Sequence, residues 1–194
     1  KNTRKGGIFM SWEFNVLYWF QSIHNNILDK FFASITKLGD GGIFWIIVIL
    51  LLLIFVKDKR LGWTGVLALA LDFLICNVIL KNVIQRERPF AVDPTLEPLV
   101  TKLINLPKDF SFPSGHSAFS FAAAVSIVQY KKKWGIAAIV LASLIAISRL
   151  YLGVHFPTDV IGGCLVGICM GLLAGLIVKK LSEVKAKKKI AKVE

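Results

Sequence analysis

Long apolar runs joined by short polar connections are the main pattern along the chain. Five runs come near the length that a helix needs to cross a bilayer: 41–56, 61–80, 116–130, 134–148 and 160–178. Asp72 is the one acidic or basic residue within them. The connections at 57–60 and 131–133 leave room only for turns between antiparallel helices. The pattern predicts an all-α membrane bundle of five transmembrane helices.

The stretch before these runs, 11–38, is amphipathic. Apolar residues recur there at helical spacing, but they are mixed with polar groups that are costly at bilayer depth. Trp12, Tyr18 and Trp19 suit the headgroup region of a membrane. We expect a segment that lies in the interface, while the basic residues near the start favour the alternative of a sixth crossing. The expected organisation is an interfacial segment, a membrane-embedded core and a basic cytoplasmic tail, at 1–40, 41–181 and 182–194.

Composition and charge support the membrane assignment. Hydrophobic residues make up 55% of the chain and charged residues 19%, which argues against a disordered chain and against a soluble enzyme. A net charge of +12 would suggest a nucleic-acid partner in a soluble protein, but no nucleic acid is expected here.

Of the 24 basic residues, 13 lie on the same side of the membrane as the C-terminal tail, if the five runs cross it in turn. We therefore expect that side in the cytoplasm and the loop 81–114 outside the cell membrane. Three scattered cysteines indicate neither a disulfide framework nor a zinc cluster.

Polar residues of the outer side fall into three clusters. In the first, Lys81 and Arg88 are seven residues apart, about two turns if the helix continues, and Pro89 is expected to end that helix. Two cations at one helix end can bind one dianionic group, and the planar guanidinium suits two phosphate oxygens. Alternatively, the side chains of Lys81 and Arg88 extend to the lipid headgroups and bind no substrate.

The second cluster precedes the run at 116–130. Ser114 and Gly115 predict a helix start whose free N–H groups and hydroxyl can bind an anion, with His116 just inside it. An ordinary capped helix with an incidental histidine is the alternative.

The third cluster lies around the turn between the last two runs. Ser148 and Arg149 end one run, and His155 precedes the next. Asp159 follows His155 by one helical turn, so its carboxylate can accept the Nδ1–H of the imidazole and leave Nε2 free. The alternatives are a structural His–Asp pair or half of a metal site, for which the chain offers few further ligands.

In chain order the three clusters read K-x6-R-P, P-S-G-H and S-R-x5-H-x3-D. They resemble the three signature motifs of the type 2 phosphatidic acid phosphatase family, which is related to the vanadium haloperoxidases. The resemblance covers residues 81–159. It implies a membrane enzyme that hydrolyses a lipid phosphate or diphosphate without a metal or another cofactor. Polyprenyl diphosphate, such as undecaprenyl diphosphate, is the favoured substrate, with phosphatidylglycerophosphate and phosphatidate as alternatives.

The resemblance also implies a role for each motif residue. His155 is the expected nucleophile that forms a phosphohistidine, Asp159 orients it, and His116 is the general acid. Five residues are expected to hold the phosphate oxygens: Lys81, Arg88, Ser114, Gly115 and Arg149. A lipid-headgroup-binding or lipid-translocating protein without chemistry would need these cations but not both histidines. A vanadate-dependent haloperoxidase fits the phosphate site but not five membrane spans.

Two further features have no place in the motifs. Small residues repeat every fourth position of the last run, at Gly163, Gly167, Gly171 and Gly175. This spacing predicts close helix packing, either within the monomer or at a dimer contact, and leaves the oligomeric state open. Asp72 is expected either to bond a neighbouring helix or to have a function of its own.

Overall fold

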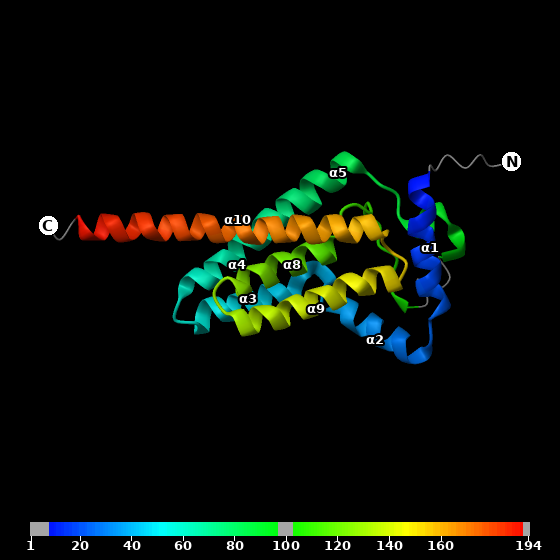
Figure 1. The fold of residues 1–194 in the computed structure, drawn as a ribbon, viewed down its shortest axis with the longest axis horizontal. Coiled ribbons are helices and arrows are strands. Elements are labelled where there is room, and N and C mark those ends of the chain that lie inside the picture. The colour runs from blue at the N-terminus through cyan, green and yellow to red at the C-terminus, as the bar shows by residue number, and fades with distance from the viewer. Residues whose placement is uncertain (1–7, 97–102, 192–194) are drawn as a thin grey trace.

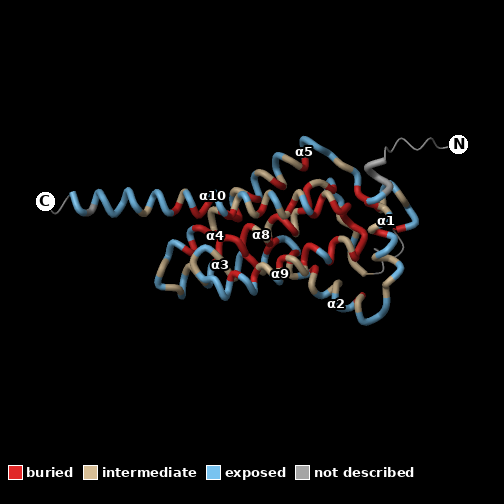
Figure 2. The backbone as a smooth tube through the Cα atoms, in the orientation of Figure 1, coloured by how far each residue is buried: buried red, intermediate tan, exposed pale blue. Residues whose placement is uncertain are grey.

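The computed structural model of the chain describes residues 8–96 and 103–191, and every regular element among them is helical. Five helices run side by side along the long axis of the molecule (Figure 1). These helices are α3 (Ile43–Phe55), α4 (Lys59–Asp72), α8 (Gly115–Val128), α9 (Lys132–Tyr151) and α10 (Pro157–Ile190). Buried residues concentrate around α8, whereas the C-terminal part of α10 extends beyond the bundle and is exposed (Figure 2).

Each of the five predicted apolar runs forms a helix, which confirms the predicted all-α membrane fold, while the number of membrane spans stays a prediction. Among the described residues, three segments are long and apolar enough to cross a membrane alone: Lys59–Val92, Lys132–Tyr151 and Pro157–Lys188. Helix α3 reaches that length only as a pair with α2 (Asn26–Lys37), bent by 42°. Helix α8 has 14 residues and is shorter than the hydrocarbon core of a bilayer. Most of its residues are buried among the other helices, so it has little contact with lipid.

The N-terminal segment forms two helices, α1 (Ile8–Ser22) and α2. Asn25 begins α2, since its side chain accepts hydrogen bonds from the backbone N–H groups of Ile27 and Leu28, both at 3.0 Å. Helix α1 lies across the end of the bundle that is far from the C-terminus (Figure 1). Trp12 and Trp19 are exposed on it. The position of this segment in a membrane interface stays a prediction.

Two glycines produce the bend between α2 and α3. Gly41 and Gly42 have φ angles of 58° and 69°, a region that glycine adopts without steric cost. They form the short helix η1 (Asp40–Gly42), which turns the chain toward the start of α8. A side chain at Gly42 would collide with the ring of Phe119, so a small residue is also needed for packing.

The helix that carries Lys81 ends earlier than the sequence predicted. It runs from α4 through the π-helical stretch η2 (Phe73–Leu80) into α5 (Lys81–Ile84). Gln85 then adopts a left-handed conformation with φ 49° and ends it. The expected helix from Lys81 to Arg88 is therefore wrong: Arg88 lies in extended backbone, and Pro89 begins α6 (Pro89–Val92) instead of ending a helix.

The glycine face of α10 packs against α8 within the chain. A Cβ atom built on Gly163 would lie 2.5 Å from the carbonyl oxygen of Ser114, and one on Gly167 would lie 2.1 Å from that of Ala118. The face that could have been a dimer contact is thus used inside the monomer.

Asp72 is fully buried in α4. Within the described part of the chain, neither of its carboxylate oxygens has a hydrogen-bond partner. The expected bond to a neighbouring helix is therefore not found there.

Substitution of Gly167 by Ala tests the packing of α10 on α8. On a free helix face this change stabilises by about 1 kcal/mol through helix propensity. Here the added methyl group collides with backbone, and overpacking costs about 1–3 kcal/mol. We expect a lower midpoint of thermal unfolding in detergent, with Leu165→Ala on the exposed face of α10 as the control. A more stable Gly167→Ala protein would contradict the packing.

Candidate active site

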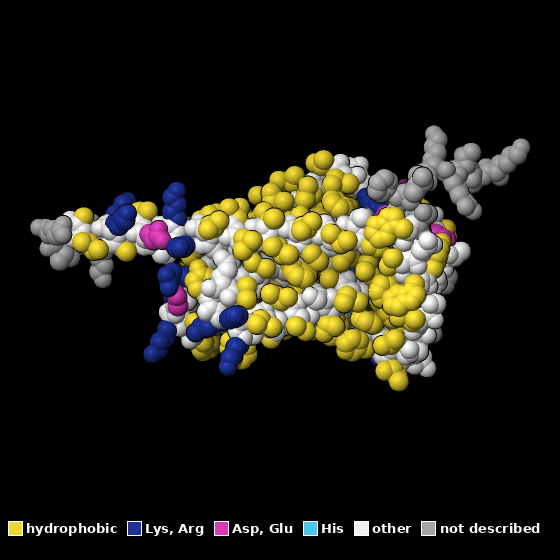
Figure 3. All heavy atoms as spheres, viewed as in Figure 1, with side chains coloured by type: hydrophobic (Ala, Val, Ile, Leu, Met, Phe, Trp, Pro, Cys, Tyr) yellow, Lys and Arg dark blue, Asp and Glu magenta, His cyan; other side chains and the backbone are white. Residues whose placement is uncertain are grey.

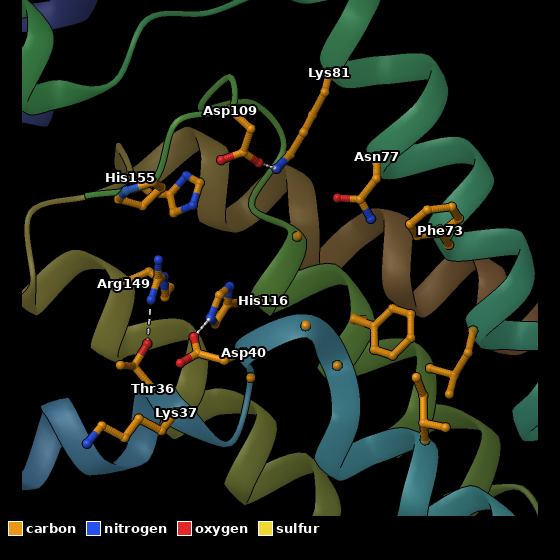
Figure 4. A pocket seen from close by; sticks show the side chains of 18 of the residues that line it. Thr36, Lys37, Asp40, Phe73, Asn77, Lys81, Asp109, His116, Arg149 and His155 are labelled. Atoms are coloured by element: carbon orange, nitrogen blue, oxygen red, sulfur yellow. Dashed lines mark hydrogen bonds and ion pairs between the residues drawn. The ribbon is translucent and has the colours of Figure 1, made fainter. Parts of the chain in front are cut away.

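A pocket of about 1120 Å³ lies among the ends of α2, α8 and α9 and continues between α3 and α4. Figure 4 shows many of the side chains that line it. All three predicted clusters contribute to its wall. Six of the predicted site residues line it: Lys81, Arg88, Gly115, His116, Arg149 and His155. Ser114 and Asp159 do not line it but lie behind the wall, where both are fully buried.

The two cations of the first cluster converge on one carboxylate. Lys81 forms an ion pair with Asp109, and Arg88 Nη2 donates to Asp109 Oδ1 at 2.7 Å. Both cations are buried, whereas the side chain of Asp109 is 53% exposed. Partial burial works to raise the pKa of Asp109, but the two cations outweigh it and hold that pKa below its usual range. Lys81 and Arg88 thus form a single anion-binding position, which the Asp109 carboxylate fills here.

Arg88 also fixes the protonation pattern of His155. Its Nη1 lies 3.2 Å from His155 Nε2 and donates to the carbonyl oxygen of Val154 at 2.8 Å. A guanidinium can only donate, so Nε2 is the unprotonated nitrogen and Nδ1 carries the hydrogen. Burial lowers the pKa of His155 well below 6.5, and the positive charges of Arg88, Arg149 and Lys81 lower it further. The ring is neutral at pH 7, with its Nε2 lone pair directed at the cations.

Ser111 lies between His155 and its predicted carboxylate partner. Asp159 Oδ2 is 3.7 Å from His155 Nδ1, too far for a hydrogen bond. Ser111 Oγ lies 3.4 Å from the same nitrogen and donates to Asp159 Oδ2. The expected direct bond is therefore replaced by a link through a hydroxyl. Sequence reasoning missed Ser111, although it opens the S-F-P-S-G-H stretch that contains the second motif.

The second histidine has its own carboxylate partner. His116 Nε2 lies 2.9 Å from Asp40 Oδ1, in the short helix between α2 and α3. Gly39 lies against the same ring, where a Cβ atom would come within 2.4 Å of it. The motif spacing gives no signal for Asp40, because it belongs to the N-terminal segment.

The start of α8 differs in one respect from the prediction. Ser114 occupies the N-cap position, but its hydroxyl accepts a hydrogen bond from Ser117 at 3.0 Å and does not cap the helix. Its backbone N–H donates to the carbonyl oxygen of Asp159 at 3.0 Å, which fixes α8 to α10. Gly115 lines the pocket beside Lys81, where a Cβ atom would lie 3.7 Å from Nζ.

Arg149 completes the cationic wall. It is buried near the end of α9 and donates through Nη1 to the hydroxyl of Thr36 on α2 (Figure 4). In the described residues its Nε has no hydrogen-bond partner. A buried guanidinium with a free donor beside Lys81 and Arg88 favours a multiply charged oxyanion. Thr36, like Asp40, is a site residue from the N-terminal segment that the sequence did not reveal.

The low pKa of His155 can be measured. We expect the ¹⁵N signals of its ring, assigned with a His155→Gln variant, to keep the neutral Nδ1–H form at pH values below about 6.5. The folded protein then binds fewer protons than the unfolded chain, so this residue lowers stability as pH falls through that range. Arg88→Met should raise the pKa, because it removes the adjacent cation. Titration of His155 at or above the ordinary value would contradict this account.

The comparisons with known proteins indicate a single family. The model of the PAP2 superfamily matches residues 61–183. Undecaprenyl-diphosphatase of Sulfolobus acidocaldarius is 36% identical over 151 residues, which cover 76% of this chain and 69% of that protein. Phosphatidylglycerophosphatase B of Bacillus subtilis is 36% identical over 171 residues, which cover 80% of this chain and 76% of that protein.

A solved structure shares the whole bundle. The crystal structure of a transmembrane PAP2-type phosphatidylglycerolphosphate phosphatase from Bacillus subtilis matches with a TM-score of 0.72 and 29% identity, covering 91% of this chain and 89% of that one. The matched family region contains all three motif clusters, and these meet at one pocket. The chain is therefore an integral membrane lipid phosphatase that belongs to the PAP2 superfamily.

Proposed function

We propose that the chain hydrolyses a lipid phosphate or diphosphate through a phosphohistidine on His155, at the outer face of the membrane. The observation that carries this proposal is the position of His155 Nε2, an unprotonated nitrogen beside the cations of the pocket. A phosphoryl group bound by Lys81, Arg88 and Arg149 lies within reach of that nitrogen. Positive charge around the phosphoryl oxygens is what stabilises a phosphoryl-transfer transition state.

The reaction has two steps that conserve charge and atoms. The Nε2 lone pair of His155 forms a bond to phosphorus while the bond from phosphorus to the leaving oxygen breaks, and that oxygen takes a proton from His116. Water then attacks the phosphohistidine, gives a proton to His116, and phosphate leaves with His155 restored. The Ser111–Asp159 pair stabilises the imidazole of His155 while it carries positive charge. Asp40 accepts the Nε2–H of His116, so the proton that passes to the leaving oxygen is the Nδ1 proton of the cationic ring.

The shape of the pocket supports a lipid substrate. Beyond Lys81 the lining becomes apolar, with Leu69 and Val66 on α4 and Ile46 and Leu50 on α3. Val66 is 15 residues from Lys81 along one helix, so the apolar part extends about 20 Å from the cations. A hydrocarbon tail fits this lining while its phosphate lies among the cations. We favour polyprenyl diphosphate over phosphatidylglycerophosphate and phosphatidate. The names of the two relatives refer to a polyprenyl diphosphate and to phosphatidylglycerophosphate.

The charge distribution supports the proposed orientation. Lysine and arginine side chains gather at the end of the bundle from which α10 extends, while the middle is apolar (Figure 3). The site lies at the other end, with the loop that contains Asp109. Because basic residues next to spans stay in the cytoplasm, we place the pocket on the outer side and the C-terminus inside.

Phosphate release from a panel of pure lipid phosphates and diphosphates in detergent tests the proposed activity. His155→Ala should abolish turnover and covalent phosphate trapping, because the nucleophile is lost. His116→Ala should slow hydrolysis of lipid substrates by about 10²–10⁴-fold, but hydrolysis of an aryl phosphate far less, since that leaving group needs no proton. Equal losses with both substrates, or phosphate trapping by His155→Ala, would contradict the assignment. A wild-type protein that binds these lipids without releasing phosphate would be a headgroup-binding protein instead.

Removal of the Asp109 carboxylate should help the substrate to bind. Asp109 fills the position between Lys81 and Arg88, so a phosphate has to displace it. Because the carboxylate is half-exposed, its ion pairs are worth little, and we expect Asp109→Asn to lower KM about 2- to 5-fold. Inorganic phosphate should inhibit this variant more strongly. Asp93→Asn is the matched control, since Asp93 contacts Tyr18 and Thr95 outside the pocket. A higher KM in Asp109→Asn would show that the carboxylate organises the cations instead.

A further inference from the structure

Arg86, inside the first motif but outside the pocket wall, connects two buried carboxylates. Its Nη1 donates to Asp159 Oδ1 at 2.6 Å, and its Nη2 donates to Glu13 Oε2 on α1, also at 2.6 Å. Asp159 and Glu13 are 0% and 3% exposed. The guanidinium carbon lies 4.1 Å from the centre of the Phe156 ring, a favourable cation–π geometry.

Thr158 forms hydrogen bonds with both Arg86 and Glu13. Its hydroxyl accepts from Arg86 Nη1 at 2.6 Å and donates to Glu13 Oε1 at 2.5 Å. Its backbone N–H lies 3.3 Å from the same carboxylate oxygen. Glu13 thus binds both Arg86 and the first turn of α10, which fixes α1 to the segment that carries His155 and Asp159.

The two oxygens of Asp159 have separate partners. Oδ2 accepts from the hydroxyl of Ser111 and from the backbone N–H of Phe156 at 2.8 Å, while Oδ1 accepts from Arg86. Without Arg86, Oδ1 would be a buried charged oxygen with its hydrogen bond removed, which costs more than the bond itself contributes. The carboxylate would then rotate, and that change disturbs Ser111 and through it Nδ1 of His155.

We propose that Arg86 and Glu13 are positioning residues for the nucleophile. Arg86 holds Asp159 in one orientation, and Glu13 on α1 holds Arg86. The connection runs from α1 through Arg86, Asp159 and Ser111 to His155. This inference rests on the proposed role of His155 and makes the N-terminal helix part of the catalytic machinery. Neither residue contacts the phosphate position, so they act on the rate of the chemical step and not on substrate binding.

The test compares kcat, KM and inhibition by inorganic phosphate for the full chain in detergent, with a soluble aryl phosphate as substrate. Arg86→Met should lower kcat by about 10- to 100-fold, the usual loss when a group that orients an active-site ligand is removed. KM and the inhibition constant should stay near their wild-type values, because the cations of the pocket are unchanged. Arg86→Lys should recover part of kcat, since it keeps the charge but cannot bind both carboxylates in the same way.

A double-mutant cycle separates positioning from general stability. Glu13→Gln, which is nearly isosteric, should also lower kcat. The double variant should be no slower than Arg86→Met, because both changes break the same connection from Glu13 through Arg86 to Asp159. Arg60→Met is the matched control, since Arg60 forms an exposed pair with Asp58 at the other end of the bundle. If Arg86→Met does not fold, Glu13→Gln alone gives the result.

Three outcomes would overturn the proposal: a wild-type kcat in Glu13→Gln and Arg86→Met, independent losses that multiply in the double variant, or a parallel loss of kcat and phosphate binding. The last would indicate a damaged fold. A wild-type protein without phosphate release would instead refute the proposed function itself, and that is seen before any variant is made.

Discussion

The burial of several cations at one end of an apolar helix bundle is the constraint on which the rest of the structure depends. Lys81, Arg88 and Arg149 are 7%, 5% and 3% exposed, and they repel one another. Buried charges are costly unless they are paired and hydrogen-bonded. Among the described residues, Asp109 pairs with Lys81 and Arg88, carbonyl and hydroxyl oxygens accept further hydrogen bonds, and a guanidinium nitrogen of Arg149 has no partner. The phosphate group of the proposed substrate would supply further negative charge and acceptors.

The same constraint explains why the site is built from helix ends. Asp159 occupies the first turn of α10, where its carboxylate accepts the backbone N–H of Phe156 and lies at the positive end of the helix dipole. One residue therefore stabilises the start of a helix, neutralises Arg86 and reaches His155 through Ser111. The backbone N–H of Phe156, the guanidinium of Arg86 and the hydroxyl of Ser111 all donate to this fully buried carboxylate.

The sequence predicted those parts of the structure that depend on local spacing. Helical runs, the three motif clusters and their meeting at one end follow from hydrophobic length and from the order of the connections. The partners that orient them could not be found in that way. Asp40 lies 76 positions from His116, and Thr36 lies 113 from Arg149, so only the folded bundle brings them together. Gln85 ends a helix in a conformation that is unusual for a residue other than glycine, and no turn signal marks it.

Under the proposed function, the apolar part of the pocket accounts for the hydrolysis of a lipid phosphate whose tail stays in the membrane. The apolar lining continues along α3 and α4, away from the cations. Extraction of a tail into water costs about 0.8 kcal/mol for each methylene group. A buried cationic pocket with an apolar extension would avoid that cost, because the headgroup would reach the cations while the tail stays among apolar side chains.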